Sequence, residues 1–544
     1  MPNLKFTRKS IVIIAGLILV IFLINSIVSS KITNKISEIL LKNDSKYYTA
    51  QIESTQFKLI RGSLYLNNIT LIPKEVALDS LIKNDLKKQA LDSVSISSVG
   101  FNGISFIDLL FSDKINVSNL EINGLHVKNF KNDEIKKISK EKKALNLDSI
   151  YIKKLKGFRI NKIKVNDFIY ESVNVNSNET TFKNEPLSFE SSGFKLEEQD
   201  SHVFKLLPVK DSFEIEKIEL NVNTIKYDIL VDKLGFNFNK NLITINKLSL
   251  KPQIPKRKLA LSYTFSKDVF DVELDALNIY NFRLDKLLNK EGIFIDSLAI
   301  SGLDMELYKD KRRPFNEDKN KSLPHISLQN MKTPLEVKKV KIANSEVLIE
   351  EHTVNRDTIM ILSFDKVNAS ILNITSVNRE HPMSLELDAR LMKKAPLKIN
   401  ADFSLKNQGF NFNGNLGTAK LKLFDSALFP AIGLKVLNGN LDSMTFVASA
   451  NNHESNGSMT MLYHNLEATV FKAGTFEKNK FLSWSVNSVI KKSNPNKKGK
   501  TRVSVMSFKR DTYKGLGNYI WKTLLSGITN SMAPGGKQVK SSRH

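Results

Sequence analysis

The chain of 544 residues carries a formal net charge of +25, with 41% hydrophobic and 25% charged residues, and it contains no cysteine. This composition excludes a disordered chain, and the missing cysteines exclude disulfides and thiolate metal sites. The length exceeds what one compact core usually holds, so we expect several domains or one elongated body.

The positive charge has two interpretations. Lys and Arg total 81 against 56 Asp and Glu, and such an excess attracts anionic partners such as lipid headgroups. Alternatively, the lysines are scattered over solvated faces. Because no basic stripe alternates with aromatic residues, we expect no nucleic-acid partner.

A membrane anchor is predicted at residues 10–29. From 11 to 28 only Asn25 and Ser26 are polar, and about 20 such residues in a helix cover roughly 30 Å, enough to cross a hydrocarbon core. The basic stretch 1–9 places the N-terminus in the cytoplasm by the positive-inside rule. A cleaved signal peptide is the alternative, although the apolar run is longer than usual and no A-x-A site follows it. We therefore predict a single-pass protein of a bacterial inner membrane, with the bulk of the chain in the periplasm.

The rest of the chain is patterned mainly for β-strands. We expect an N-terminal β-rich region at 30–310 and a C-terminal one at 322–508, separated by the highly charged segment 309–321, which contains Pro314. Apolar residues at helical spacing also predict a helix within 76–90.

One pattern, apolar-x-apolar-x-x-apolar-x-apolar, recurs along the chain. Each half alternates at period two and predicts a strand. The three-residue step would turn the second half to the other face of the sheet, unless a β-bulge or a tight bend at the central polar pair restores the face. We interpret the pattern as a bent strand unit; the alternative is that a β-rich chain matches it by chance. Full copies begin at Leu64, Ile115, Leu145, Phe213, Ile243, Ile293 and Leu335, and a looser copy begins at Leu362.

The stretch 433–470 reads as consecutive strands around a polar turn. Met459, Met461 and Tyr463 alternate at period two, which predicts one buried face, and the Asn/Ser/Gly run 451–457 predicts a connection.

The C-terminal region 509–531 predicts an amphipathic helix, followed by a basic tail at 532–544 that we expect to be disordered. Tyr519, Trp521 and Leu524 are candidate membrane-surface residues, because an aromatic-bearing amphipathic helix beside basic residues can lie on a bilayer. The alternative is a helix that covers an open end of the sheet.

The sequence contains no motif for catalysis or for a cofactor. It lacks a G-x-S-x-G elbow, a G-x-x-x-x-G-K-[ST] loop and an H-E-x-x-H zinc motif. His453 and His464 lie 11 positions apart without further converging ligands, so they predict no metal site. We therefore predict no catalytic residues, no cofactor and no metal, and a protein that is not an enzyme.

These features predict a mainly β fold. An N-terminal transmembrane helix is followed by an elongated, twisted, largely antiparallel β-sheet curled into a groove, with a C-terminal amphipathic helix. A groove lined by alternating Leu, Ile, Val and Phe would suit acyl chains, whereas a sheet that folds on itself would bury the same residues as an ordinary sandwich. The candidate groove-lining residues are Leu64, Leu66, Val117, Leu120, Leu147, Ile150, Ile215, Ile218, Ile245, Leu248, Ile295, Leu298, Val337 and Val340.

Several stretches near the C-terminus resemble one known family. They are residues 428–430, 437–446, 457–466, 508–511 and 517–527. With the anchor and the bent strands, they are similar to AsmA-like proteins, including the bacterial group with the domain of unknown function 748, most closely its Bacteroidetes-type members. The resemblance implies an inner-membrane-anchored periplasmic protein with an elongated β-groove, linked to phospholipid movement between membranes and to outer-membrane homeostasis. It also implies an architecture related to that of bridge-like lipid transfer proteins.

Residues and resemblance together predict a lipid-handling protein whose groove shields the acyl chains of a phospholipid or another acyl lipid from water. The alternative is a scaffold or chaperone-like factor for outer-membrane protein assembly, with outer-membrane or periplasmic partner proteins.

Overall fold

The computed structural model describes residues 48–58, 61–83, 90–105, 114–132, 157–198, 204–209, 212–222, 226–288, 291–354, 357–471, 490–533 and 535–539. These residues are mainly in β-strands, as predicted. No helix among them is long and apolar enough to cross a membrane, and the predicted anchor at 10–29 lies outside this set. The chain divides into two compact units, residues 1–239 (unit 1) and 240–544 (unit 2). The charged segment 309–321, where the sequence suggested a boundary, lies inside unit 2.

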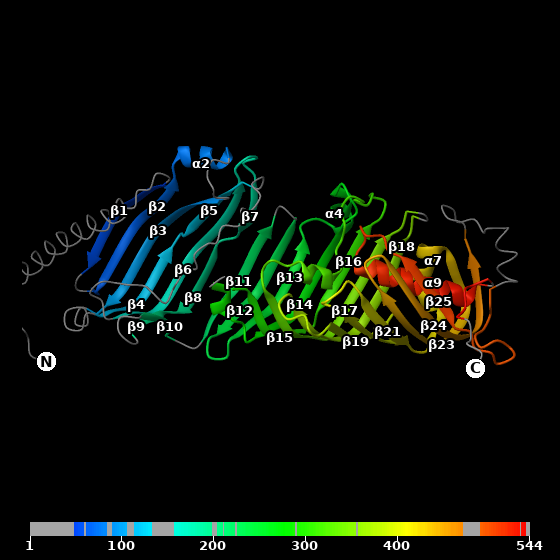
Figure 1. Cartoon of the computed structure of the whole chain (residues 1–544). Helices are drawn as coiled ribbons and strands as arrows, with labels where there is room; N and C mark the ends of the chain where they lie inside the picture. Colours follow the sequence, from blue (N-terminus) through cyan, green and yellow to red (C-terminus); the bar gives the residue numbers. More distant parts are fainter. Residues whose placement is uncertain are drawn as a thin grey trace, which may run out of the picture. The chain divides into compact units, whose positions relative to one another are not determined.

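Unit 1 contains a mixed, mainly antiparallel sheet (Figure 1). The predicted helix near its start is α2 (Glu75–Ile82), whose Ala77 and Leu81 are buried against Leu91. The strands of unit 1 are β1 (Tyr48–Lys58), β2 (Ser63–Pro73), β3 (Ala90–Ile104), β4 (Lys114–Asn123), β5 (His126–Lys131), β6 (Gly157–Asn174), β7 (Thr180–Asn184), β8 (Leu187–Ser192), β9 (Phe194–Glu198), β10 (Phe204–Pro208), β11 (Ser212–Val222) and β12 (Tyr227–Asn237).

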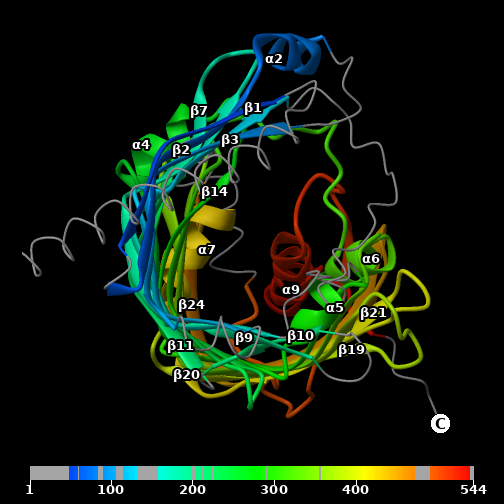
Figure 2. The ribbon, with the colours of Figure 1, turned by 90° about the vertical axis from the view of Figure 1, so that its left-hand side faces the viewer.

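Unit 2 also has mixed strand pairing, and helices pack on its strands. Within this unit the sheet curves around α7 (Asp425–Ile432) and α9 (Leu516–Met532) (Figure 2). The strands are β13 (Leu242–Pro252), β14 (Asp268–Tyr280), β15 (Ile293–Ser301), β16 (Asp304–Asp310), β17 (Leu335–His352), β18 (Ile359–Thr375), β19 (Met383–Leu391), β20 (Ala395–Phe403), β21 (Phe410–Leu416), β22 (Ala419–Lys420), β23 (Leu434–Ala450), β24 (Glu454–Val470) and β25 (Ser504–Lys509). The remaining helical elements are α4 (Lys256–Ser262), α5 (Leu284–Leu288), α6 (Pro324–Gln329) and the 3₁₀ turn η3 (Leu421–Phe424).

Each unit contains one long strand broken by a glycine. In unit 1, β4 and β5 are separated at Gly124, which has a φ of 61°; β3 pairs antiparallel with both pieces and β6 pairs parallel with both. In unit 2, β15 and β16 are separated at Gly302, with a φ of 62°, between antiparallel β14 and parallel β17. The two glycines are 178 residues apart, and the strands around both follow one order: a strand, a helix, a second strand, the broken strand and a parallel strand. Unit 2 adds the short helix α5 (Leu284–Leu288) before its broken strand. The structure therefore contains an internal repeat, which is more regular than the sequence pattern suggested.

The charged segment 309–321 leads from the broken strand of unit 2 to its parallel partner. A parallel partner cannot be reached by a tight turn and needs a crossover connection. Residues 311–334 connect β16 to β17 in this way. The charged segment 309–321 is therefore mostly a crossover within one unit.

The bend predicted at the polar pair is confirmed in several copies of the pattern. Asn68, Lys247 and Lys366, each the second residue of its polar pair, have φ values of 49°, 48° and 51°. On either side of Asn68 the apolar residues keep apolar partners, with Leu66 opposite Val99 and Ile69 opposite Ile96 in β3. A left-handed residue at the bend therefore lets both halves of the pattern contribute to one face.

In another copy the left-handed residue directly follows the neighbouring strand β14. Asn281 has a φ of 54°, and its Nδ2 donates to Oδ2 of Asp296, in the polar pair of that copy, at 2.8 Å. The copy that begins at Leu145, with candidates Leu147 and Ile150, lies outside the described residues.

The stretch 433–470 is the antiparallel hairpin of β23 and β24. Met459, Met461 and Tyr463 are all buried, which confirms the predicted buried face. The turn is shorter than expected, because β24 begins at Glu454. The Asn451 side chain closes it by accepting the N–H groups of His453 and Glu454 at 2.7 and 3.0 Å.

The C-terminus differs from the prediction. Residues 537–539, which we expected in a disordered tail, hydrogen-bond beside β25: the N–H of Val505 donates to Lys537 O at 3.0 Å, and the N–H of Val539 donates to Val503 O at 2.9 Å. Residues 537–539 thereby bond to the edge of β25 that does not pair with β24. The basic composition of the tail gave no sign of this pairing.

Candidate apolar binding site

A cavity of about 300 Å³ lies in unit 2 between α9, α7 and the sheet. Its lining is apolar and comes from strands β17 to β24 together with η3 and the two helices. The lining residues are Ile349, Leu362, Phe364, Leu391, Leu397, Ile399, Leu416, Leu421, Phe424, Ala427, Leu428, Val436, Leu441, Met444, Phe446, Met461, Leu466, Gly517, Ile520, Trp521, Leu524, Ile528 and Met532.

Strand β23 supplies four of these side chains in spite of irregular spacing. Val436, Leu441, Met444 and Phe446 are separated by five, three and two positions, so a regular strand would not place them on one face. The register of β23 against β24 shifts around Asn438 and between Leu441 and Ser443. These irregularities bring all four side chains to the cavity.

Helix α9 has a polar face toward the sheet and an apolar face toward the cavity. The hydroxyl of Thr523 lies 2.7 Å from that of Ser455, and the hydroxyl of Ser531 lies 2.8 Å from that of Ser504. At Gly527 a Cβ atom would stand 2.6 Å from Cγ of Met506, so only glycine permits this close approach. Small and hydroxyl-bearing residues therefore hold the helix to β24 and β25, and its large apolar residues remain for the cavity.

Charged residues lie at the end of the cavity where α9 begins. Lys311 is paired with Glu351 of β17, and Nζ of Lys514 lies 2.8 Å from Oδ2 of Asp511. The pKa of Lys522 is lowered, first by burial and then by the positive charges of Lys311 and Lys514. This end of the site is therefore electropositive.

Loops from distant parts of the sequence hold this end together. The guanidinium of Arg510 donates to the carbonyl of Lys321 in the crossover, and the hydroxyl of Thr512 donates to Oδ1 of Asn320 at 2.7 Å. The ring of Phe315 in the crossover lies 5.8 Å from the ring of Tyr513. The crossover and the start of α9 therefore form one packed corner.

The candidate membrane-surface residues lie on or near the inner side of α9. Tyr519 is 2% exposed and belongs to the core, while Trp521 and Leu524 are half-buried and line the cavity. The sequence left two alternatives for this helix, one on a membrane surface and one over an open end of the sheet. In the structure it packs on the sheet and lines the cavity.

The candidate groove-lining residues fall into apolar pairs across neighbouring strands. Residues directly opposite one another in adjacent strands share a face. Val117, Val337 and Val340 are buried. The other candidates that the structure describes are half-buried: Leu64, Leu66, Leu120, Ile215, Ile218, Ile245, Leu248, Ile295 and Leu298. The pairs are Leu64 with Phe101, Leu66 with Val99, Val117 with Ile160, Leu120 with Ile163, Ile215 with Leu234, Ile218 with Val231, Ile245 with Leu277, Leu248 with Leu274, Ile295 with Val337, and Leu298 with Val340.

Two rows run across unit 1, one apolar and one polar. The apolar row, Leu64, Phe101, Leu120 and Ile163, continues across four strands, and all four side chains are half-buried. The polar row is joined by hydrogen bonds of 3.1 Å between Asn67 and Ser54, 3.0 Å between Asn123 and Ser98, and 2.6 Å between Asn166 and Asn123. The polar residues alternate with the apolar ones along the strands, so the sheet has one polar and one apolar face.

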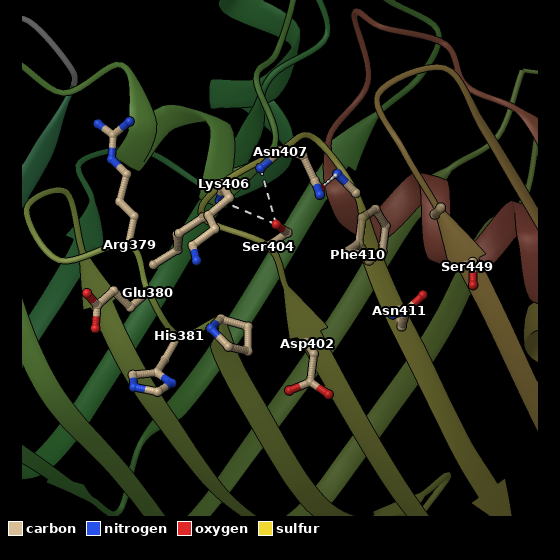
Figure 3. Close-up of a pocket in the computed structure, with 14 residues that line it drawn as sticks. Arg379, Glu380, His381, Asp402, Ser404, Lys406, Asn407, Phe410, Asn411 and Ser449 are labelled. Carbon is tan, nitrogen blue, oxygen red and sulfur yellow. Dashed lines mark hydrogen bonds between the residues drawn. The ribbon is translucent and has the colours of Figure 1, made fainter.

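A separate hollow of about 490 Å³ in unit 2 is polar (Figure 3). Its hydrogen bonds belong to a loop, in which Oγ of Ser404 accepts the N–H groups of Lys406 and Asn407 at 3.3 and 3.2 Å. His381 and Asp402 lie nearby, but within the described part of the chain no hydrogen bond joins either to the other or to Ser404. The described residues also contain no group of three or more His, Asp or Glu side chains placed to hold a metal.

None of the predicted groove-lining residues that the structure describes lines the cavity beneath α9. The period-two pattern of Met459, Met461 and Tyr463 predicted the buried face that supplies Met461, whereas Leu441 and Met444 reach the cavity through the register shifts of β23. No sequence signal showed that α9 would lie opposite this face, because that packing joins elements far apart in the chain.

No known family model matches the chain, and no curated protein matches it.

Proposed function

We propose that this protein binds the acyl chains of phospholipids or related lipids in the apolar cavity beneath α9, and that it is a lipid-handling protein and not an enzyme. The observation that carries the proposal is the cavity itself, whose lining side chains from Ile349 to Met532 are all apolar. Its volume of about 300 Å³ is at the lower end of the range of small-molecule pockets, which suits one acyl chain or part of one.

The energetic cost of such a space supports a binding role. Protein interiors are normally close-packed. This cavity has a mouth at Gly517, so without a ligand its apolar lining is open to water. An apolar ligand removes that exposure, since apolar cavities accept apolar molecules.

The apolar row of unit 1 supports the same function independently. Leu64, Phe101, Leu120 and Ile163 are large apolar side chains on one face, and none of them is fully buried. Contiguous apolar surface of this kind usually serves an apolar ligand or partner. We propose that acyl chains also lie along this row.

The resemblance to AsmA-like proteins supports the cellular setting of the proposal. In this setting residues 10–29 anchor the protein in a bacterial inner membrane, and the two units lie in the periplasm, where they handle lipid for outer-membrane homeostasis. Native mass spectrometry of the full-length protein, released from gentle detergent, tests the central claim. We expect bound species with the masses of acyl lipids, and protein free of lipid would contradict the proposal.

A variant at the mouth of the cavity makes this test specific. Gly517 lines the cavity, and a Cβ atom added there meets no heavy atom within 4 Å. Gly517→Phe therefore places a ring at the mouth without disturbing the core, and we expect it to reduce the bound lipid several-fold. Gly535→Phe is the matched control, because Gly535 also has open space around it but does not line the cavity. Equal amounts of lipid on both variants would show that the lipid lies elsewhere.

A further inference from the structure

Lys522 is a half-buried cation without a partner among the residues that the structure describes. Two carboxylates, Asp511 and Glu351, lie close enough to raise its pKa. Asp511 is already paired with Lys514 at 2.8 Å, and Glu351 is already paired with Lys311. Lys522 itself makes no ion pair or hydrogen bond with any residue that the structure describes. The group of three lysines and two carboxylates thus keeps one uncompensated positive charge.

This charge stands at the edge of the apolar lining. Lys522 follows Trp521, which lines the cavity, on the same turn of α9. On the facing strand, Glu351 lies two residues beyond Ile349, which also lines the cavity, and regular pairing with β18 puts both on one face of β17. Lys522 and Glu351 are therefore close neighbours of residues that line this end of the cavity.

The cavity is long enough for the tail of such a ligand. Its lining residues on α9 extend from Gly517 to Met532, which is about 22 Å along a helix axis at 1.5 Å per residue. A lipid tail spans about half of a hydrocarbon core of roughly 30 Å. The start of α9 also lies at the charged end, where the positive end of the helix dipole adds to the attraction for an anion.

We propose that Lys522 binds the headgroup of a single-chain anionic lipid, a fatty carboxylate, whose acyl chain occupies the cavity beneath α9. This inference rests on the proposed function and names the class of lipid. The carboxylate supplies the partner that Lys522 lacks, while Lys311 and Lys514 add attraction at longer range. A lipid with a neutral headgroup leaves Lys522 unpaired. The selectivity is the difference between the free energy of binding of the fatty carboxylate and that of the neutral lipid.

Trp521 provides a direct reading of cavity occupancy. The chain has two tryptophans, Trp484 and Trp521, so Trp484→Phe leaves one fluorophore in the cavity wall. The experiment uses the full-length Trp484→Phe protein in amphipol, titrated with dibromostearic acid and with its uncharged methyl ester. Bromine quenches tryptophan fluorescence only on contact, so quenching reports the chain beside Trp521.

We expect the acid to quench at a lower concentration than the ester. Lys522→Gln should raise the half-quenching concentration of the acid about five-fold, as for loss of a partly exposed ion pair, and leave that of the ester unchanged. Lys522→Arg should retain the preference. Lys398→Gln, at an exposed lysine outside the cavity, should behave like the parent protein.

The outcomes separate the two proposals. If acid and ester bind equally, or if Lys522→Gln weakens both alike, the headgroup assignment is overturned while acyl binding in the cavity stands. If neither compound quenches Trp521, acyl binding in the cavity fails and the headgroup assignment fails with it.

Discussion

The hydroxyl of Thr523 on α9 lies 2.7 Å from the hydroxyl of Ser455 on β24, and the two residues are 0% and 1% exposed. Thr523 also donates to the carbonyl of Tyr519 at 2.9 Å, so the Ser455 hydroxyl is the donor between the two side chains. A helix that covers an apolar cavity is thus attached to the sheet through buried hydrogen bonds.

Replacing Thr523 with Val removes this acceptor and preserves the shape of the side chain. The Ser455 hydroxyl then keeps only a long contact of 3.4 Å to the carbonyl of Phe508. We expect the free energy of unfolding of unit 2 to fall by about 1–3 kcal/mol, the cost of a buried polar group left without a good partner. Urea unfolding followed by Trp521 fluorescence in the Trp484→Phe background measures this loss.

The matched control for this substitution is Thr529→Val on the same helix. Thr529 is exposed, and its hydroxyl bonds to the carbonyl of Leu525 at 2.8 Å. We expect a change within about 0.5 kcal/mol, as for most surface substitutions. Equal losses at both positions would mean that helix propensity and not the contact with Ser455 holds α9 in place.

Leu441→Ala should enlarge the cavity at a measurable cost. Leu441 is 1% exposed and lines the cavity from β23. We expect a loss of about 2–5 kcal/mol in the free energy of unfolding. Added stearate should restore more stability to this variant than to the parent, because a ligand that binds only the folded state stabilises it by mass action. A ligand-induced shift no larger than that of the parent would argue against an acyl chain in contact with Leu441.

The glycines that break the long strands should respond alike. In Gly124→Ala and Gly302→Ala the alanine backbone must keep a φ near 60°. The new Cβ would lie 2.3 Å from Oγ of Ser97 in Gly124→Ala and 2.0 Å from Oδ2 of Asp275 in Gly302→Ala. We expect each variant to lose about 1–3 kcal/mol. Hydrogen-exchange protection of β4–β5 and of β15–β16 measures the loss in each unit separately.

An asparagine variant separates the backbone effect from crowding. Asparagine tolerates the left-handed region better than alanine, and Asn68 and Asn281 already adopt it in this protein. Gly302→Asn should therefore cost less than Gly302→Ala, although its side chain is larger. The reverse order would mean that crowding by Asp275 dominates.

Acidification should destabilise unit 2 through His325. The imidazole is 0% exposed, with its ring 5.5 Å from that of Phe403 and 5.9 Å from that of Phe410. Burial, and then the charge of Arg510, lowers the pKa of His325, although the nearby backbone of Gln408 opposes the shift. The unfolded chain therefore binds the proton more readily, so stability falls as the pH drops below the ordinary histidine pKa of about 6.5 and stops falling below the pKa of the folded state.

His325→Phe tests this pH dependence. Urea midpoints of the parent at about pH 7.5 and about pH 5 should differ by an amount equivalent to about 1–2 kcal/mol from this residue, since each pH unit contributes at most about 1.4 kcal/mol. The variant should lose that part of the difference. His464→Phe is the control, because His464 is half-exposed and bonded to Asp442 at 3.1 Å. An unchanged pH dependence in His325→Phe would assign the effect to other groups.

The sequence predicted the local features of this fold better than its long-range ones. The step around Asn68 predicted a bend, because alternation along a strand can change phase only through an irregular residue. The alternation at Met459 and Met461 predicted a buried face for the same local reason. Two parallel pairings left no comparable signal: that of β6 with β4 and β5, and that of β17 with β15 and β16. A strand has the same side-chain period in either orientation, so the sequence does not show which orientation it takes.

The candidate site shows the same limit. The apolar residues of β23 and the apolar face of α9 were each visible in the sequence, but their meeting depends on which surface the helix covers. Lys522 gave no signal either, because its significance comes from Lys311 and Glu351 on segments far away. Composition alone made it one lysine among many.

The contact between the crossover and the start of α9 has a consequence for biosynthesis. Arg510 and Lys321 are 189 residues apart in sequence, and Thr512 and Asn320 are 192 apart. During translation the crossover therefore emerges long before its partners. The strands around it can pair as they appear, but the corner beside α9 is completed only when residues 510–512 and α9 have been synthesised. A nascent protein consequently exposes its apolar interior until then, which gives chaperones their longest opportunity at this corner.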